Sequence, residues 1–231
     1  MNFLKNYKNI LCFFSHPDDE TLGAGGLLSV ASDNKIKINI AFSNTGIMAR
    51  NDINKKNNNL KNLHKDTYNA LSLFKIAKNR IIFGKFPDNM SDTIPLLRIT
   101  QWVEKIIKKI KPDLILTHHR HCTNIDHRLL HEAVITATRP NEKSKIDILS
   151  CEVLSSTGYL RPANFEPTLY LNLSKKNLDQ KIKALKKYKS EIRDYPHPRS
   201  AEAVKALSMI RGTECGSKFA EAFIINKIIS I

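Results

Sequence analysis

Residues able to bind a metal ion or move a proton gather directly after a short apolar run near the start of the chain. The run covers residues 10–14 (ILCFF) and suits a buried strand, which Pro17 prevents from continuing. The cluster reads HPDDE (residues 16–20), and leucines at helical spacing begin just beyond it. It therefore lies at a strand-to-helix junction, the place where open α/β folds bind ligands.

Two interpretations compete for this cluster. Acidic residues are common at helix N-termini, where they cap free N–H groups and face the positive end of the helix dipole. Capping explains one or two of the acids, but it does not explain His16. His16 and Asp19 stand three residues apart across a turn fixed by Pro17, so an imidazole nitrogen and a carboxylate oxygen can face one ion. Asp18 would then be free to face a water molecule, and we favour a metal site.

A second cluster, HHRHCTNIDH (residues 118–127), holds four of the chain's eight histidines. It follows another apolar run, DLILT (residues 113–117), and precedes a helical pattern. Adjacent strands of one parallel sheet would bring the two clusters together, which makes His127 a candidate third ligand. Two imidazoles and one carboxylate leave a fourth position open, as in catalytic zinc sites. Asp126 beside His127 is typical of the carboxylates that support a ligand.

Other residues near these clusters each allow a structural interpretation. Asn124 is placed to cap the helix that follows it. His118 and His119 fit packed positions at a strand end better than metal ligation. Arg50 lies in a polar stretch (residues 43–58) that we expect to form a loop over the site. Its guanidinium either contacts a hydroxyl or phosphate of the substrate or is a solvated loop charge.

The elements that must position these residues alternate along the chain. Strands are expected at residues 10–14, 36–42, 80–83, 113–117, 147–154 and 169–173, and in the tail at 220–229. Helices are expected from residue 20 and at 60–74, 94–111, 124–138, 178–192 and 201–210. This alternation predicts one α/β domain over residues 1–231 with a mostly parallel, doubly wound sheet. The glycines of GAGG (residues 23–26) do not form GxGxxG, so we expect them to allow close packing rather than to bind a dinucleotide.

Composition restricts the class of protein. The 231 residues are enough for one large core, and no apolar run approaches the roughly 20 residues of a membrane span. The apolar start runs directly into the charged cluster, unlike a signal peptide. The four cysteines form no CxxC pair, which predicts free thiols in the cytoplasm. The net charge of +15 is spread over helical stretches without interleaved aromatic residues, so we favour solvated faces over nucleic-acid binding.

HPDDE after a first strand, paired with NIDHR (residues 124–128) before a helix, resembles the PIG-L/LmbE-like family of zinc-dependent N-deacetylases. The similarity runs along nearly the whole chain. It includes TGIMAR (45–50), DNMSDTIPLL (88–97), THH (117–119), TATRP (136–140), YPHPRS (195–200) and AEAF (220–223). The resemblance implies a Rossmann-like, three-layer fold.

The resemblance also implies a set of roles. One Zn²⁺ per chain would be held by His16, Asp19 and His127, with Asp18 as the general base. The reaction would be hydrolysis of the amide of an N-acetylated amino sugar on a nucleotide or another carrier. We place Asp126 with the catalytic residues. The expected substrate contacts are Arg50, Asp88, His119, Asn124 and Arg199.

The chain departs from the family pattern at one position. Many members have a histidine three residues before the ligand histidine, where this chain has Asn124. An amide has no proton to give at neutral pH, so another group must protonate the leaving amine. His197 is our candidate, since Pro196 and Pro198 hold the backbone stiffly and could aim its ring inward. The alternative is that these residues form a rigid surface turn.

Two other functions remain open from the sequence. Clustered Asp and His could serve a metal-dependent phosphoesterase, although the single compact ligand set argues against two metals. A basic nucleic-acid-binding module without catalysis is the other alternative. We expect a small amino-sugar substrate as the partner, no nucleic acid and no membrane span, and we leave a homo-oligomer open.

Overall fold

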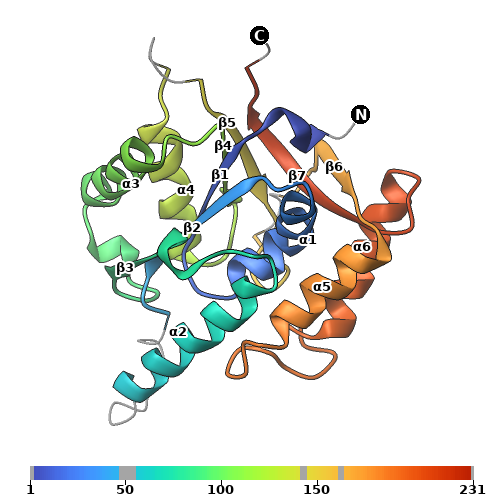
Figure 1. Cartoon of the computed structure of the whole chain (residues 1–231). Coiled ribbons are helices and arrows are strands. Elements are labelled where there is room, and N and C mark those ends of the chain that lie inside the picture. Colours follow the sequence, from blue (N-terminus) through green and yellow to red (C-terminus); the bar gives the residue numbers. More distant parts are fainter. Residues whose placement is uncertain (1–2, 47–55, 141–144, 161–163, 230–231) are drawn as a thin grey trace.

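A seven-stranded sheet forms the centre of the computed structural model, which describes residues 3–46, 56–140, 145–160 and 164–229 (Figure 1). The strands are β1 (Asn9–Phe14), β2 (Lys37–Asn44), β3 (Ile81–Phe86), β4 (Leu114–His118), β5 (Asp147–Cys151), β6 (Leu169–Asn172) and β7 (Ala220–Lys227). Their order is β3-β2-β1-β4-β5-β7-β6. The first five strands are parallel, and β7 runs antiparallel to β5 and β6. The expected mostly parallel sheet is confirmed.

Helices cover both faces of the sheet (Figure 1). They are α1 (Asp19–Asp33), α2 (Lys56–Ser72), α3 (Leu96–Ile110), α4 (Ile125–Ala137), α5 (Lys175–Leu185) and α6 (Ala201–Glu214). Successive side chains of β1 point to opposite faces of the sheet, and β1 is buried on both faces. Phe13 shares one buried cluster with Val103 of α3, whereas Phe14 shares another with Leu27 of α1 and Leu71 of α2. Helices on one face, the sheet, and helices on the other face form the expected three layers.

The glycines of α1 allow an unusually close approach to its neighbours. A Cβ atom on Gly26 would lie 2.5 Å from Leu173 Cδ1 and 2.8 Å from Glu221 Cδ. Lys181 of α5 donates to Glu221 at 2.7 Å, and the Glu221 carboxylate accepts the backbone N–H groups of Gly26 and Leu27. A buried ion pair thus joins α1, α5 and β7, and the expected packing role of the glycines is confirmed.

Several boundaries differ from the sequence-based expectation, and two segments differ as follows. The helix expected at 178–192 begins at Lys175 and ends at Leu185, and residues 186–200 form turns instead. Tyr188 is buried there, and its hydroxyl donates to Glu20 Oε1 at 2.6 Å, so the chain leaves the helix to reach α1. The polar stretch 43–58 is not all loop, since β2 continues to Asn44 and α2 begins at Lys56.

The order of the strands reverses between β1 and β4. β1 pairs with β2 on one side and with β4 on the other, so the carboxyl ends of β1 and β4 form the switch point at which doubly wound sheets bind ligands. Both sequence clusters follow these two strands, as predicted. Among the described residues, no helix is long and apolar enough to cross a membrane.

Candidate active site

The turn after β1 is held in an uncommon backbone conformation. Asp18 is the N-cap residue of α1 and has φ 114°, a left-handed value that non-glycine residues rarely adopt. Glu20 stabilises this turn, because its Oε2 accepts the Asp18 N–H at 3.0 Å and its Oε1 accepts the Tyr188 hydroxyl. Glu20 is fully buried, and these bonds use its carboxylate for structure.

The second cluster enters α4 through a capped N-terminus. The Asn124 Oδ1 accepts the Asp126 N–H at 2.9 Å, so the expected helix cap is confirmed. Asn124 Nδ2 donates to Asn89 Oδ1 at 2.9 Å, which ties α4 to the loop after β3. His127 follows in the first turn of α4 and is 2% exposed.

Three side chains from the two strand ends converge on one point. Asp19 Oδ2 lies 3.3 Å from His16 Nδ1 and 3.1 Å from His127 Nε2, and the two ring nitrogens are 3.4 Å apart. Ligands of a tetrahedral zinc with bonds near 2.1 Å are about 3.4 Å apart. The three atoms therefore form a nearly equilateral triangle of the size that one such ion requires.

Two carboxylates contact His16 Nε2, the ring nitrogen that does not belong to the triangle. This atom lies 2.9 Å from Asp126 Oδ2 and 3.1 Å from Asp88 Oδ1. Asp126 is fully buried and also accepts the backbone N–H groups of Asn89 and Ser91, at 2.7 and 3.0 Å. Asp126 thus contacts His16 rather than its neighbour His127, an arrangement typical of a carboxylate that positions a metal ligand. Asp88, an expected substrate contact, lies against His16 as well.

The ring nitrogen of His127 that lies outside the triangle, Nδ1, has different neighbours. It lies 3.3 Å from both Cys122 Sγ and Ser156 Oγ. Cys122 is buried, and its sulfur also lies 3.1 Å from Thr157 Oγ1. The two candidate imidazole ligands are therefore fixed from behind, one by carboxylates and the other by a thiol and a hydroxyl.

His16, Asp88 and Asp126 form a second group with metal-binding atoms close together. Their shared nitrogen is His16 Nε2, on the far side of the ring from the first triangle. Both Asp126 oxygens already accept backbone N–H groups. This group fits the support of one ligand, not the closely spaced pair of ions of a two-metal phosphoesterase.

Burial and negative charge set the electrostatics of the site. Burial lowers the pKa of His127, but Asp19 outweighs this effect and raises it to about 9. Burial likewise lowers the pKa of His16, yet Asp126, Asp19 and Asp88 together raise it well above its ordinary value. The carboxylates therefore favour positive charge at this point, which a metal cation also supplies.

Asp18 has a buried carboxylate oxygen without a hydrogen bond. The residue is 1% exposed, and its Oδ2 has no hydrogen-bond partner among the described residues. The nearest cation is Arg199, whose Nε lies 3.4 Å away. Burial raises the pKa of the Asp18 carboxyl well above its usual value, while Arg199 acts in the opposite direction. A buried carboxylate oxygen without a hydrogen bond, beside three converging side chains, fits a metal site better than simple helix capping.

His118 and His119 are packed residues at the end of β4. His118 Nε2 accepts the Ser15 N–H at 2.8 Å, and the ring stacks on His127 with centroids 3.7 Å apart. His119 is 5% exposed and makes an edge contact with Phe165, and burial lowers its pKa to about 4. Neither belongs to the converging set, in agreement with the packed interpretation.

The expected inward aim of His197 is wrong. The side chain is exposed, and its Nδ1 accepts the Arg199 N–H at 3.0 Å, so the turn holds the ring at the surface. Arg199 itself reaches the site and bridges Asp18 and Glu191. Arg50 lies outside the described residues. Sequence reasoning missed Cys122, Ser156 and Glu191, because no motif or spacing links them to the two clusters.

The PIG-L family model, described as GlcNAc-PI de-N-acetylase, matches residues 11–138, more than half of the chain. The chain belongs to the PIG-L family. The matched stretch runs from β1 through α4 and contains both clusters. The resemblance noted in the sequence is thereby confirmed, and the converging residues lie in the part that defines this family of deacetylases.

The chain is also similar to known proteins in sequence and in fold. The "Probable N-acetyl-alpha-D-glucosaminyl L-malate deacetylase 2" of Bacillus cereus is 24% identical over 189 residues, which cover 80% of this chain and 84% of that protein. The N,N'-diacetylchitobiose deacetylase of Pyrococcus horikoshii has a TM-score of 0.79 at 19% identity, covering 96% of this chain and 85% of that one. A 4-carboxy-2-hydroxymuconate hydratase from Pseudomonas putida reaches 0.74 at 13% identity, covering 97% and 98%. Because this last protein is a hydratase, similarity of fold does not fix the reaction, and the site must be argued on its own.

Proposed function

We propose that this PIG-L family member is a metal-dependent N-deacetylase that hydrolyses the acetamide of an N-acetylated amino sugar on a nucleotide-linked or carrier-linked precursor. The observation that carries the proposal is the triangle of His16 Nδ1, Asp19 Oδ2 and His127 Nε2 at the switch point of the sheet. The family assignment and the deacetylases among its relatives support the choice of an acetamide as the bond cleaved.

Zn²⁺, one per chain, is the metal that we propose, and His16, Asp19 and His127 would hold it. Two imidazole nitrogens and one carboxylate oxygen are a donor set of catalytic zinc sites. When bound, the ion supplies a Lewis acid that polarises a carbonyl and promotes ionisation of water. Asp126 and Asp88 hold the His16 ring in place, and Cys122 and Ser156 hold the ring of His127.

Asp18 is the proposed general base. Its Oδ2 is buried and without a hydrogen-bond partner in the described part of the chain, so it can accept a proton from the attacking water. The water oxygen bonds to the acetyl carbon, the C–N bond breaks, and acetate and an amine are released. Arg199, 3.4 Å from Asp18, keeps this carboxylate in place.

The leaving amine also needs a proton. Asn124 has none to give, and His197 is exposed. Burial lowers the pKa of His118 and of His119, which disfavours their protonated forms. We therefore propose that Asp18 Oδ2 returns the proton that it took from water to the amine nitrogen. His197→Gln should then keep most of the wild-type rate. Loss of the rate in that variant would restore His197 as the acid.

The test is a screen of the zinc-loaded protein against free and nucleotide-linked N-acetyl sugars, with phosphate monoesters in parallel. Released acetate and released phosphate are both measured. We expect acetate from at least one N-acetyl sugar and no phosphate. Phosphate release without acetate release would support the phosphoesterase alternative and contradict the proposal.

A further inference from the structure

The thiol of Cys122 belongs to a small polar cluster behind His127, on the side of the ring that faces away from the triangle. Its sulfur is fully buried and lies 3.3 Å from His127 Nδ1, 3.3 Å from Ser156 Oγ and 3.1 Å from Thr157 Oγ1. Ser156 Oγ also lies 3.3 Å from His127 Nδ1. The thiol and the Ser156 hydroxyl are thus two candidate partners for the ring nitrogen of His127 that does not face Asp19.

The segment after β5 forms a turn that fixes both hydroxyls. The Val153 carbonyl accepts the backbone N–H groups of Ser156 and Thr157, each at 2.8 Å. The Thr123 N–H donates to the Ser156 carbonyl at 2.9 Å. Cys122 and Thr157 form an antiparallel bridge beside this bond. Backbone hydrogen bonds therefore hold the turn against the chain that carries Cys122, and the side-chain contacts of the cluster are built into the fold.

The protons of this cluster give each contact a direction. Thr157 Oγ1 accepts the Val153 N–H at 2.9 Å, so its own proton is available to the Cys122 sulfur. The Ser156 hydroxyl donates to the Val153 carbonyl at 3.5 Å, which leaves its oxygen to accept the Cys122 S–H. A histidine that binds a metal through one ring nitrogen carries its proton on the other nitrogen. The His127 Nδ1 proton therefore needs an acceptor in this cluster.

The sulfur suits this proton better than the Ser156 oxygen does. A separation of 3.3 Å exceeds the about 2.7–3.2 Å of ordinary N–H···O bonds, whereas sulfur is a larger atom and accepts at longer range. The sulfur also contacts only the Nδ1 side of His127, because Nε2 lies 3.1 Å from Asp19 Oδ2. The geometry thus makes the thiol a partner of the ring rather than a member of the triangle.

We propose that Cys122 is a positioning residue for the metal site, and that its sulfur accepts the Nδ1 proton of His127 and so keeps the Nε2 lone pair directed at the ion. The proposal rests on the proposed function, because it concerns the ion that this function requires. An acceptor behind a ligating imidazole fixes its tautomer and its orientation. Carboxylates do this for His16, whereas a thiol oriented by Thr157 does it for His127.

The affinity of the full chain for Co²⁺, measured by competition with a chromogenic chelator, tests this role without turnover. We expect Cys122→Ala to lower the affinity by about 10–100-fold. Cys122→Ser keeps an acceptor and should restore most of it. Cys122→Val fills the space without an acceptor, so it should lose affinity like the alanine variant and decides the test if that variant does not fold.

The matched control is Cys151→Ala. Cys151 is also fully buried, but its sulfur contacts the Thr117 carbonyl at 3.4 Å. General loosening of the core would lower the affinity in both alanine variants, whereas loss of the His127 partner would lower it only in Cys122→Ala. Equal affinities in the two variants, or no loss in Cys122→Ala and Cys122→Val, would overturn the proposal.

The absorption spectrum of the Co²⁺-loaded protein separates positioning from direct ligation. A cysteine sulfur bound to Co²⁺ gives a strong sulfur-to-metal charge-transfer band in the near ultraviolet, and we expect none in the wild type. A band that disappears in Cys122→Ala would make Cys122 a ligand and overturn the proposal. Wild-type protein that binds Co²⁺ as expected but, loaded with Zn²⁺, releases no acetate would contradict the proposed function alone.

Discussion

Asp18 and Glu20 are two buried carboxylates only two residues apart, and they differ in their hydrogen bonds. Glu20 accepts from the Asp18 N–H, the Thr21 hydroxyl and the Tyr188 hydroxyl. Asp18 Oδ2 has no hydrogen-bond partner in the described structure, and its backbone is strained at φ 114°. A residue with a strained backbone and a buried oxygen that lacks a hydrogen bond is expected where function requires it.

Asp18→Asn should therefore separate activity from stability. We expect acetate release to fall by about 10²–10⁴-fold, the usual cost of losing a general base. The melting temperature should change little, because within the described residues the buried oxygen has no hydrogen bond and its one ion pair joins it to the partly exposed Arg199 at 3.4 Å. The contrasting variant is Glu20→Gln, which should lower the free energy of unfolding by about 1–3 kcal/mol. A strongly destabilised Asp18→Asn, or one with normal turnover, would disprove this division of roles.

Asp126, which we placed with the catalytic residues, lies against His16 in the structure. Both of its oxygens accept hydrogen bonds, so the amide of Asp126→Asn would place a donor against His16 or a backbone N–H. We expect metal affinity to fall by about 10–100-fold while the fold persists. Competition with a chromogenic chelator measures this affinity, and Asp92→Asn on the exposed side of the same region is the control. Equal affinity in both variants would show that Asp126 does not position His16.

The position of α1 depends on its glycines as much as on its leucines. A Cβ on Gly26 meets Leu173 and Glu221 at 2.5–2.8 Å, and Glu221 cannot retreat because it is bound to Lys181. Gly26→Ala should lower the free energy of unfolding by roughly 1–3 kcal/mol, measured by urea denaturation. Lys183→Ala on the exposed face of α5 should change it by less than about 0.5 kcal/mol. Equal stability of the two variants would mean that α1 has room to shift.

The sequence predicted the elements that carry strong hydrophobic patterns and missed those held by single tertiary contacts. Apolar runs placed β1 and β4 within two residues of their ends, and helix N-caps placed the start of α4. The end of α5 was missed because Tyr188 leaves the helical pattern to bind Glu20. His197 was misplaced for a similar reason, since a hydrogen bond to its near neighbour Arg199 holds the ring at the surface. The triangle of His16, Asp19 and His127 was predictable because a parallel sheet dictates where two strand ends meet.

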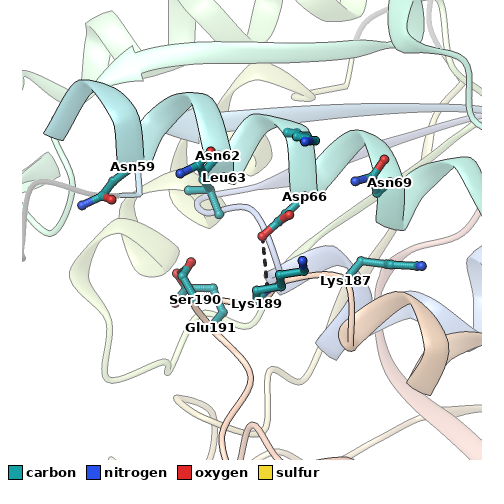
Figure 2. Close-up of a pocket in the computed structure, with 10 residues that line it drawn as sticks. Asn59, Asn62, Leu63, Asp66, Asn69, Lys187, Lys189, Ser190 and Glu191 are labelled. Atoms are coloured by element: carbon teal, nitrogen blue, oxygen red, sulfur yellow. Dashed lines mark hydrogen bonds between the residues drawn. The ribbon is translucent and has the colours of Figure 1, made fainter. Parts of the chain in front are cut away.

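The positive charge of the protein suits an anionic small substrate, although the lysines are spread evenly along the sequence. The net charge of +15 attracts anionic small molecules toward the protein over distances of about a Debye length. Only the fold brings Lys65, Lys187 and Lys189 together in one groove, between α2 and the turns after α5 (Figure 2). The same charge that suggested nucleic acid in the sequence therefore also suits a small anionic substrate.

We propose that one metal ion, held by His16, Asp19 and His127, makes this protein an N-deacetylase. The most direct measurement is a titration of metal-free protein with Zn²⁺ while acetate release from an accepted N-acetyl sugar is followed. We expect activity to rise from zero in proportion to added zinc and to stop rising at one equivalent per chain, with no such rise in His127→Ala. Full activity without metal, a break at two equivalents, or an unchanged titration in His127→Ala would contradict the account.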